Sequence, residues 1–394
     1  MSLSQGSASS SSSEATALGE LLLFAGAVAD YAAGAPSGDG ERIGSLACAI
    51  AAVEELDDAQ RAAAYFGSRL RNLGAIGNAA LRKGETLPER ARMMALRDIP
   101  AQGARLCELI KALPSGTADV VRWQAESYDG TGYPDQLRWT GIPRAAQIVH
   151  IATVFVTYSD PEEALPAISA EAGRAFAPEQ TRSFLMWYHT RGGEIEIVQP
   201  PFDDLDPLAS TTDEIVELLA AKTDEHNASP ARSRRVARTA MQIVRALEGS
   251  DEDADRALLS GYLYGIGELR SPQREDEQFD PLSRLGIETR AEHAHAAAKL
   301  LERCPALAGI APIVGARAEW FDGSGKPQGR RANEIPLASQ ALALAIAHER
   351  LEETRQSRIT GDRTPPLSRL ETAAGTQFDP RLVRALQTTR KAAK

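Results

Sequence analysis

Two loops of nearly identical sequence carry acidic side chains that could take part in chemistry. Asp129 begins the segment DGTGYP and Asp322 begins DGSGKP, and a glutamate precedes each loop by three residues, Glu126 and Glu319. A carboxylate beside a glycine-rich turn could serve in general acid–base catalysis. Because the two loops lie 193 residues apart (Glu126 to Glu319) in separate copies, we interpret the glutamates as one loop-bracing residue used twice. The aspartates are predicted to cap the turns.

Histidine and acidic residues elsewhere could bind a metal ion. His293 and His295 lie two residues apart on a predicted helix and would point about 200° apart, so they cannot bind one ion together. The triplet from Asp224 to His226 is predicted to form a surface patch near the start of a helix, where acidic residues are favoured. We therefore interpret the two histidines as solvated or supporting side chains rather than as a shared metal site.

Composition excludes several other classes of protein. The three cysteines, Cys48, Cys107 and Cys304, are too far apart in sequence for a disulfide framework or a CxxC zinc site, and we expect buried thiols in a reducing cytoplasm. A net charge of −10 disfavours nucleic acid as a partner. We find no signal-peptide pattern and no apolar stretch that approaches membrane-spanning length, so we predict a cytoplasmic protein without membrane association.

The elements that must position these residues are helices. An aromatic share of 5% is low and fits Ala- and Leu-rich helices rather than strands. Apolar residues recur at helical spacing in the segments Leu18–Tyr31, Ile43–Leu56, Met93–Leu113, Ile215–Ala221, Val236–Leu247, Ala291–Leu301 and Leu337–Leu351. We therefore predict an all-α fold, and a length of 394 residues favours two domains.

An internal repeat organises the chain. The offset of 193 residues between the two loops recurs between Arg42-Ile43 and Arg235-Val236 and between Ile142-Pro143 and Ile335-Pro336. Such a repeat indicates two copies of one structural unit. We predict two tandem helical bundle domains over residues 14–198 and 208–394, preceded by a disordered serine-rich tail (1–13) and joined by a proline- and aspartate-rich linker (199–207).

Both copies resemble the HD-GYP family, a branch of the HD-domain phosphohydrolases that hydrolyses cyclic di-GMP at a centre of two or three metal ions. The family pattern runs from an early His on a helix through HDxGKxG, a third His and an HH pair to a DGxGYP loop and an Asp on an Ile-Pro helix. The loop is the most specific match, and its family positions are Asp129, Gly130, Gly132, Tyr133 and Pro134 in the first copy and Asp322, Gly323, Gly325 and Pro327 in the second. The resemblance implies tandem HD-like bundles.

The same resemblance indicates that the family's metal ligands are replaced. Their positions hold Asp39, Arg71, Asn72, Ile99, Gln124 and Thr153 in the first copy, and Arg232, Tyr264, Gly265, His293, Arg317 and Ile346 in the second. A catalytic metal centre needs several converging donors and open positions for water and phosphate. His293 is the one residual candidate ligand, so these positions predict no catalytic residues, no bound metal and no cofactor.

These replacements predict a catalytically inactive pseudo-enzyme, a regulatory binding or scaffolding module in bacterial cyclic di-GMP signalling. One alternative is a metal-free cyclic-dinucleotide sensor in which Arg71 or Arg232 holds a phosphate, although structural ion pairs would also explain both arginines. The other is an active metal-dependent phosphodiesterase with a non-standard site around His293. The family also implies a protein partner, a diguanylate cyclase domain, which the GYP loop of the first copy would contact.

Overall fold

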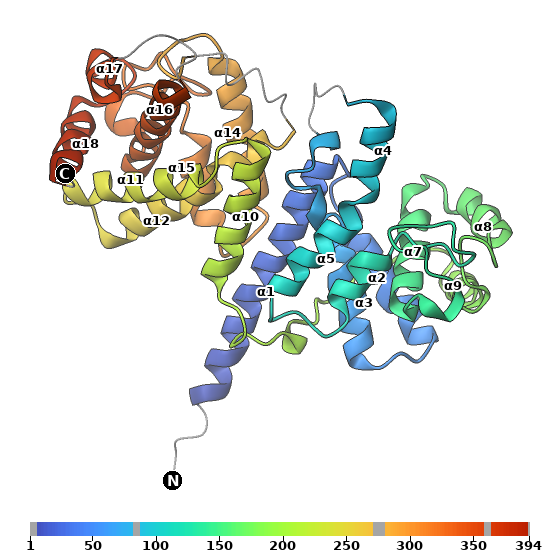
Figure 1. Cartoon of the computed structure of the whole chain (residues 1–394). Helices are drawn as coiled ribbons and strands as arrows, with labels where there is room; N and C mark the ends of the chain where they lie inside the picture. Colours follow the sequence, from blue (N-terminus) through green and yellow to red (C-terminus); the bar gives the residue numbers. More distant parts are fainter. Residues whose placement is uncertain (1–5, 82–86, 271–279, 358–363, 393–394) are drawn as a thin grey trace. The chain divides into compact units, whose positions relative to one another are not determined.

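The computed structural model describes residues 6–81, 87–270, 280–357 and 364–392 (Figure 1). Over these residues the chain is helical, with isolated bridges such as the one between Ala172 and Phe176 and no strand. The predicted all-α fold is therefore confirmed. The chain divides into two compact units, the first ending at Ile215 and the second beginning at Val216, and each is described by itself.

Unit 1 is a bundle of helices. Its core lies between the faces of three helices that are distant in sequence, α2, α7 and α9. The α-helices of unit 1 are α1 (Gly6–Ala33), α2 (Asp39–Val53), α3 (Asp58–Leu70), α4 (Glu89–Arg97), α5 (Ile99–Leu109), α6 (Thr117–Trp123), α7 (Arg144–Thr157), α8 (Pro161–Ala170) and α9 (Pro178–Arg191).

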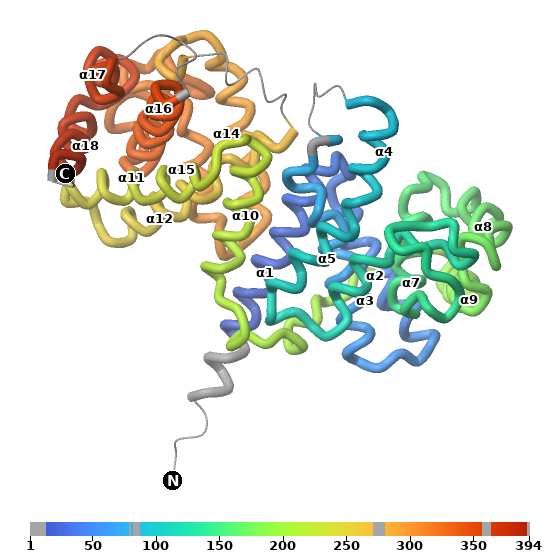
Figure 2. The backbone as a smooth tube through the Cα atoms, viewed as in Figure 1, coloured from blue at the N-terminus to red at the C-terminus, as the bar shows by residue number. Residues whose placement is uncertain are grey.

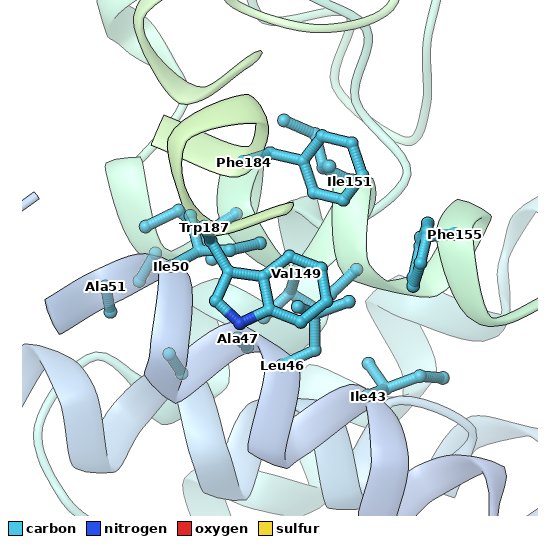
Figure 3. Close-up of a cluster of buried hydrophobic side chains, with 14 of the residues drawn as sticks. Ile43, Leu46, Ala47, Ile50, Ala51, Val149, Ile151, Phe155, Phe184 and Trp187 are labelled. Carbon is cyan, nitrogen blue, oxygen red and sulfur yellow. The ribbon is translucent and has the colours of Figure 1, made fainter. Parts of the chain in front are cut away.

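An aromatic cluster fills the core of unit 1 (Figure 3). Phe155 of α7 meets Phe184 and Trp187 of α9 edge to face, with ring centroids 5.2 and 5.7 Å apart. Leu46 and Ile50 of α2 are fully buried beneath these rings. Edge-to-face pairs add to the free energy gained by burying apolar area, so α9 is held firmly against α2 and α7.

Helix α1 differs from the sequence-based expectation in where it begins and in how long and apolar it is. It begins at Gly6, so residues 6–13 of the predicted serine-rich tail belong to this helix. By length and composition Ser13–Ala33 could span a membrane, which corrects the expectation that no stretch approaches this length. However, 61% of its most apolar window is buried in the protein, including Leu18, Leu22 and Val28. This burial is that of a core helix.

Two further segments differ from the predicted pattern. The segment predicted as one helix, Met93–Leu113, is two helices, because α4 ends at Arg97 and α5 carries Pro100 in its first turn; proline lacks the N–H that a continuous helix needs. The proline-rich segment 199–207 packs on unit 1, where Leu205 is buried and the Asp206 N–H donates to the Ala112 carbonyl at 3.1 Å. The chain passes from one unit to the next inside α10 (Thr212–His226).

Unit 2 repeats this architecture around α11, which lies against α12, α16 and α18 (Figure 2). Val236, Ala240 and Ile243 form the buried face of α11, and its other face is rich in arginine. After α10, the α-helices described in unit 2 are α11 (Arg232–Ala246), α12 (Asp251–Leu263), α14 (Ile287–Leu301), α15 (Ala311–Gly315), α16 (Leu337–Ser357), α17 (Pro366–Thr372) and α18 (Pro380–Ala392).

Candidate functional site

The two DG loops have the same internal hydrogen bonds. Asp129 Oδ1 accepts from the Thr131 N–H at 2.9 Å and from its hydroxyl at 2.6 Å, and Asp322 Oδ1 accepts from the Ser324 N–H at 2.8 Å. The hydrogen bonds from Thr131 hold the pKa of Asp129 below its usual value. The contacts confirm that both aspartates cap their turns.

A buried glutamate braces each loop from inside. Glu126 accepts hydrogen bonds from the backbone N–H groups nine and eleven residues later, at 2.6 and 3.1 Å. Glu319 accepts from the equivalent groups at 2.7 and 3.0 Å. Gly132 and Gly325 allow this approach, because a Cβ at either position would lie within 2.1 Å of backbone nitrogen. The predicted bracing role is confirmed. Both oxygens of each carboxylate accept hydrogen bonds from the backbone of the loop.

A second pair of matched glycines fixes the family positions in space. A Cβ on Gly74 would lie 2.1 Å from the Ile99 carbonyl oxygen, and a Cβ on Gly267 would lie 2.1 Å from the His293 carbonyl oxygen. Both glycines therefore let the turn after one helix press against the next helix. The HDxGK segment and the third-His position are thus held together in both units, and the scaffold of the family site is present twice.

In unit 1 an ion pair occupies the HD positions. Arg71 Nη2 lies 3.2 Å from Asp30 Oδ1 in α1, and Asn72 donates to the same oxygen at 2.9 Å. The Gln124 side chain donates to the Arg71 carbonyl at 2.9 Å. Both charged side chains are largely buried, and burial raises the pKa of Asp30 above its usual value, although Arg71 partly offsets it. The structure thus brings Arg71, Asn72 and Gln124 together.

The other two family ligand positions of unit 1, Asp39 and Thr153, lie on α2 and α7. Asp39 is the first residue of α2, and its carboxylate lies 3.8 Å from Arg42. The backbone next to it adjoins the buried pair, because a Cβ on Gly40 would lie 3.0 Å from Arg71 Nη1. Thr153 lies within α7. A phosphate that reached Arg71 would have to displace Asp30.

In unit 2 a guanidinium group and a tyrosine occupy the equivalent positions. Arg317 Nη2 lies 3.3 Å from Glu268 Oε1, and the Arg317 guanidinium lies 5.3 Å from the centre of the Tyr264 ring. Asn227 donates to the other Glu268 oxygen at 3.1 Å. Burial raises the pKa of Tyr264 above its usual value. Tyr264 at the HD position and Arg317 at the HH position are therefore in contact in this unit. They form no metal site, because Arg317 is a cation that pairs with Glu268.

Arg232 lies at the early-His position, at the start of α11. Its Nε donates to Glu353 Oε2 of α16 at 2.9 Å, and its Nη2 also contacts Ser229 and Glu353. Its neighbour one turn on, Arg235, donates to Glu353 Oε1 at 2.6 Å. A phosphate at Arg232 would have to compete with Glu353.

The remaining unit 2 positions carry little metal-binding chemistry. His293 is buried while His295 is exposed, which confirms that the two point to opposite sides of α14. Gly265 provides no side-chain donor, and Ile346 is a buried apolar residue of α16. Within the described ranges, no group of His, Cys, Asp and Glu side chains that could hold a metal ion forms around His293, and the non-standard metal site stays a prediction.

The Asp224 triplet is not the surface patch predicted from the sequence. It ends α10 instead of beginning a helix, and Asp224 and His226 are buried. Asp224 accepts from the Ser233 N–H at 3.0 Å and from its hydroxyl at 2.7 Å, so it satisfies donors at the start of α11. Burial raises the pKa of Asp224 above its usual value.

The donor set does not fit a family metal centre. Across the described segments, no three His, Cys, Asp or Glu side chains lie together in a way that could hold a metal ion. The scaffold positions carry Arg71 and Arg317 instead, whose charge opposes a cation. No reaction step is therefore assigned to a metal ion.

A polar cavity in unit 2 contains titratable groups that the sequence analysis missed. It has a volume of about 770 Å³, and its lining includes Arg235, His348, Glu349, Glu353 and Arg390. The available sequence signal was spacing: Glu349 and Glu353 follow Ile346 by three and seven residues, so they share its helix face. Carboxylates thus lie one and two turns beyond the family's Asp position.

Glu349 is the centre of this cavity's charge network. It accepts from Arg235 Nε at 2.7 Å and from Arg390 Nη2 at 3.1 Å, and His348 Nδ1 lies 3.2 Å from its Oε1. Burial pushes the pKa of Glu349 upward, but the bonds from His348 and Arg235 outweigh it and hold the pKa below its usual value. The arrangement places a histidine, a carboxylate and two guanidinium groups around solvent-accessible space.

Comparison with known proteins agrees with this repeated helical scaffold. Residues 27–179 and 214–382 each match the family described as HD domain. Together these matches cover most of the chain, and each lies within one of the two copies found in the sequence. The chain belongs to the HD domain family, and the predicted family and tandem architecture are confirmed.

Two relatives come from Vibrio cholerae. The chain is 27% identical to 3'3'-cGAMP-specific phosphodiesterase 3 of serotype O1 over 285 residues. This alignment covers 66% of this chain and 60% of that protein. A solved cyclic GMP-AMP specific phosphodiesterase superposes with a TM-score of 0.66 at 20% identity, covering 95% of this chain and 97% of the other. At that identity the structural likeness shows the fold.

These findings correct two predictions. The prediction of a catalytically inactive regulator is wrong, because the curated relative is a phosphodiesterase. The prediction that no cofactor is used is also overturned, since the HD family and this relative point to a divalent metal ion. The relative's name gives cGAMP where the resemblance implied cyclic di-GMP. It names no protein partner, so the diguanylate cyclase contact stays a prediction.

Proposed function

We propose that this chain is an HD-type phosphodiesterase that acts on a 3'3'-cyclic dinucleotide, with cGAMP as the first substrate to test. The similarity over 285 residues to 3'3'-cGAMP-specific phosphodiesterase 3 carries the proposal. The free thiols of Cys48, Cys107 and Cys304 fit a reducing compartment, so the proposed location is the cytoplasm.

The proposed site is the polar cavity of unit 2. Its volume of about 770 Å³ is in the range of small-molecule sites. Hydrolysis joins a water oxygen to phosphorus and releases a ribose hydroxyl, so it requires proton transfer and stabilisation of phosphate charge. In this arrangement His348 transfers the proton, and Arg235 and Arg390 exchange their bonds with Glu349 for bonds to a phosphodiester.

The first experiment measures hydrolysis of cGAMP, cyclic di-GMP and cyclic di-AMP by the full chain. Each substrate is tested with added manganese, iron or magnesium and with a chelator, while calorimetry measures binding under the same conditions. Turnover of a cyclic dinucleotide supports the proposed activity, and the metal series identifies the cofactor. Binding without turnover under every metal condition would contradict a phosphodiesterase and favour a sensor.

A matched pair of histidine variants tests the location of the site. His348→Gln is expected to lower kcat by about a hundredfold or more, the usual contribution of a proton-transfer residue. His295→Gln is the control, because His295 is an exposed residue of unit 2 that does not line the cavity. Equal activity of the two variants would place the reaction elsewhere in the chain.

A further inference from the structure

Exposed large apolar side chains concentrate at two places in unit 1. Among the described residues, nine such side chains are exposed, and five of them fall at these places. Met93 and Met94 lie on α4, and Val53, Met186 and Ile197 lie on or beside a cavity between α2 and α9. Contiguous exposed apolar area marks protein contact sites. Each of the two places is therefore a candidate protein contact site.

The cavity is an apolar groove, and we name it the α2–α9 groove. It has a volume of about 820 Å³. Its floor includes Leu46 and Ala49 of α2 and Trp187 of α9, and the segment from Glu194 to Asp204 forms one wall. The wall is anchored where the Val198 N–H donates to the Ser45 hydroxyl at 3.2 Å. The groove lies away from Arg71 and the other family positions, which do not line it.

The edge of the groove is acidic. Its lining includes four carboxylates, those of Asp58, Glu194, Glu196 and Asp204, against the two guanidinium groups of Arg61 and Arg191. Arg61 is paired with Asp58, and Arg191 lies 3.4 Å from Glu196. The balance of charge therefore favours an occupant that is apolar along one face and basic beside it.

Helix α4 has that chemistry. None of its residues is buried, and Met93 and Met94 are 44% and 64% exposed. Arg90 and Arg97 are exposed, and because they lie three residues before Met93 and three residues after Met94, they share the face of the two methionines. Its nine residues span about 13 Å, the same length as the nine residues of α2 from Ser45 to Val53 that run along the groove. Methionine side chains adapt readily to an apolar surface.

We propose that α4 of one copy of this chain docks in the α2–α9 groove of a second copy. Met93 and Met94 enter the groove, and Arg90 and Arg97 meet the carboxylates of Glu194 and Glu196. If both copies exchange the contact, the pair has twofold symmetry and each chain uses both surfaces once. The contact involves neither the cavity of unit 2 nor its reaction.

Charge reversal tests the pairing. The mass of the full chain in solution is measured by light scattering over a concentration series, and a dimer of the 42.2 kDa chain is expected. Reversing α4 (Arg90→Glu with Arg97→Glu) or the groove (Glu194→Lys with Glu196→Lys) should each weaken the dimer at least tenfold. The two variants mixed should form a heterodimer, because each basic surface then faces an acidic one. All of these side chains are exposed, so the folding of each variant can be checked by its circular dichroism.

Disulfide trapping gives an independent readout. A Met94→Cys chain mixed with a Met186→Cys chain should crosslink faster than either chain with a Leu208→Cys control, since Leu208 is 90% exposed and lies outside both surfaces. A chain that stays monomeric at all concentrations overturns the proposal. So does a dimer that survives both charge reversals or crosslinks equally through Leu208→Cys.

Discussion

Two buried carboxylates, one in each unit, have pKa values shifted in opposite directions. In unit 1 Asp30 pairs with Arg71, and burial raises its pKa. In unit 2 burial also acts on Glu349, but His348, Arg235 and Arg390 surround it, and its pKa is lowered. The difference follows the partners of each carboxylate: Arg71 and Asn72 offset the effect of burial on Asp30 only in part, whereas His348 and Arg235 outweigh it at Glu349.

The two networks also differ in access to solvent. The Arg71 side chain is 6% exposed, whereas that of Arg235 is 42% exposed and lines a cavity. A ligand can therefore reach the charges of unit 2 without opening the core, while the charges of unit 1 are closed off. The family positions hold a buried ion pair in both units, Arg71–Asp30 and Arg317–Glu268, and the solvent-accessible charges of unit 2 lie in a separate cavity.

Breaking the unit 1 ion pair should have the largest effect on stability. Asp30→Ala leaves the buried Arg71 without its carboxylate, which is expected to cost about 4 kcal/mol in free energy of unfolding. Chemical denaturation measures it. Glu353→Ala in unit 2 is the comparison, and it should cost less because Glu353 is more exposed, Arg232 keeps its hydrogen bond to Ser229 and Arg235 keeps Glu349. Equal losses would show that the two networks do not differ in burial as described.

Adding a methyl group at the matched glycines should have the next largest effect. Gly74→Ala and Gly267→Ala each place a Cβ within 2.1 Å of a carbonyl oxygen, and overpacking of this kind costs about 2–3 kcal/mol. Gly141→Ala and Gly309→Ala are the controls in units 1 and 2, since a Cβ there meets nothing within 4 Å. Thermal unfolding of the four variants tests whether the two units share this contact, and a loss in one unit alone would contradict it.

The fold was predictable because its signals are local or repeated. Helical spacing of apolar residues needs only a short window, and the loops at Asp129 and Asp322 hold their register over 193 residues. The bracing role of Glu126 and Glu319 followed from the same repeat. Pro100 also signalled the break between α4 and α5 in the sequence. Apolar periodicity continues on both sides of this proline, so the segment was predicted as one helix.

The candidate site was much less predictable. The motif positions directed attention to His293 and Arg317, while the cavity is lined by Arg235, His348 and Glu349. These residues come together through the packing of α11, α16 and α18, which no single segment encodes. The Asp224 triplet was misplaced for a related reason, because burial of a polar run depends on a tertiary contact with Ser233.

The loop-bracing glutamates should give a smaller and equal effect in the two units. Glu126→Gln and Glu319→Gln each place an amide N–H against a backbone N–H that a carboxylate oxygen now accepts, at a cost of about 1–2 kcal/mol. Glu55→Gln, on an exposed residue of unit 1, is the control. If the unit 1 loop is instead used for catalysis, Glu126→Gln would lower turnover far beyond its effect on stability.

The pH dependence of stability should separate Asp30 from Glu349 by sign. A raised pKa in the folded state means that the folded protein binds the proton more tightly, so the contribution of Asp30 is present below its unfolded pKa and is lost as the pH rises through the folded value. The lowered pKa of Glu349 acts in the opposite sense: its contribution is present above the unfolded pKa and is lost as the pH falls through the folded value. Denaturation between about pH 2 and 7 compares the wild type with Asp30→Asn and Glu349→Gln, because Glu349 titrates below its usual range and Asp30 above it. Relative to Asp30→Asn the wild type should lose stability as the pH rises, and relative to Glu349→Gln it should gain. The same sign for both would mean that burial dominates in both units, and that the cations around Glu349 do not outweigh it.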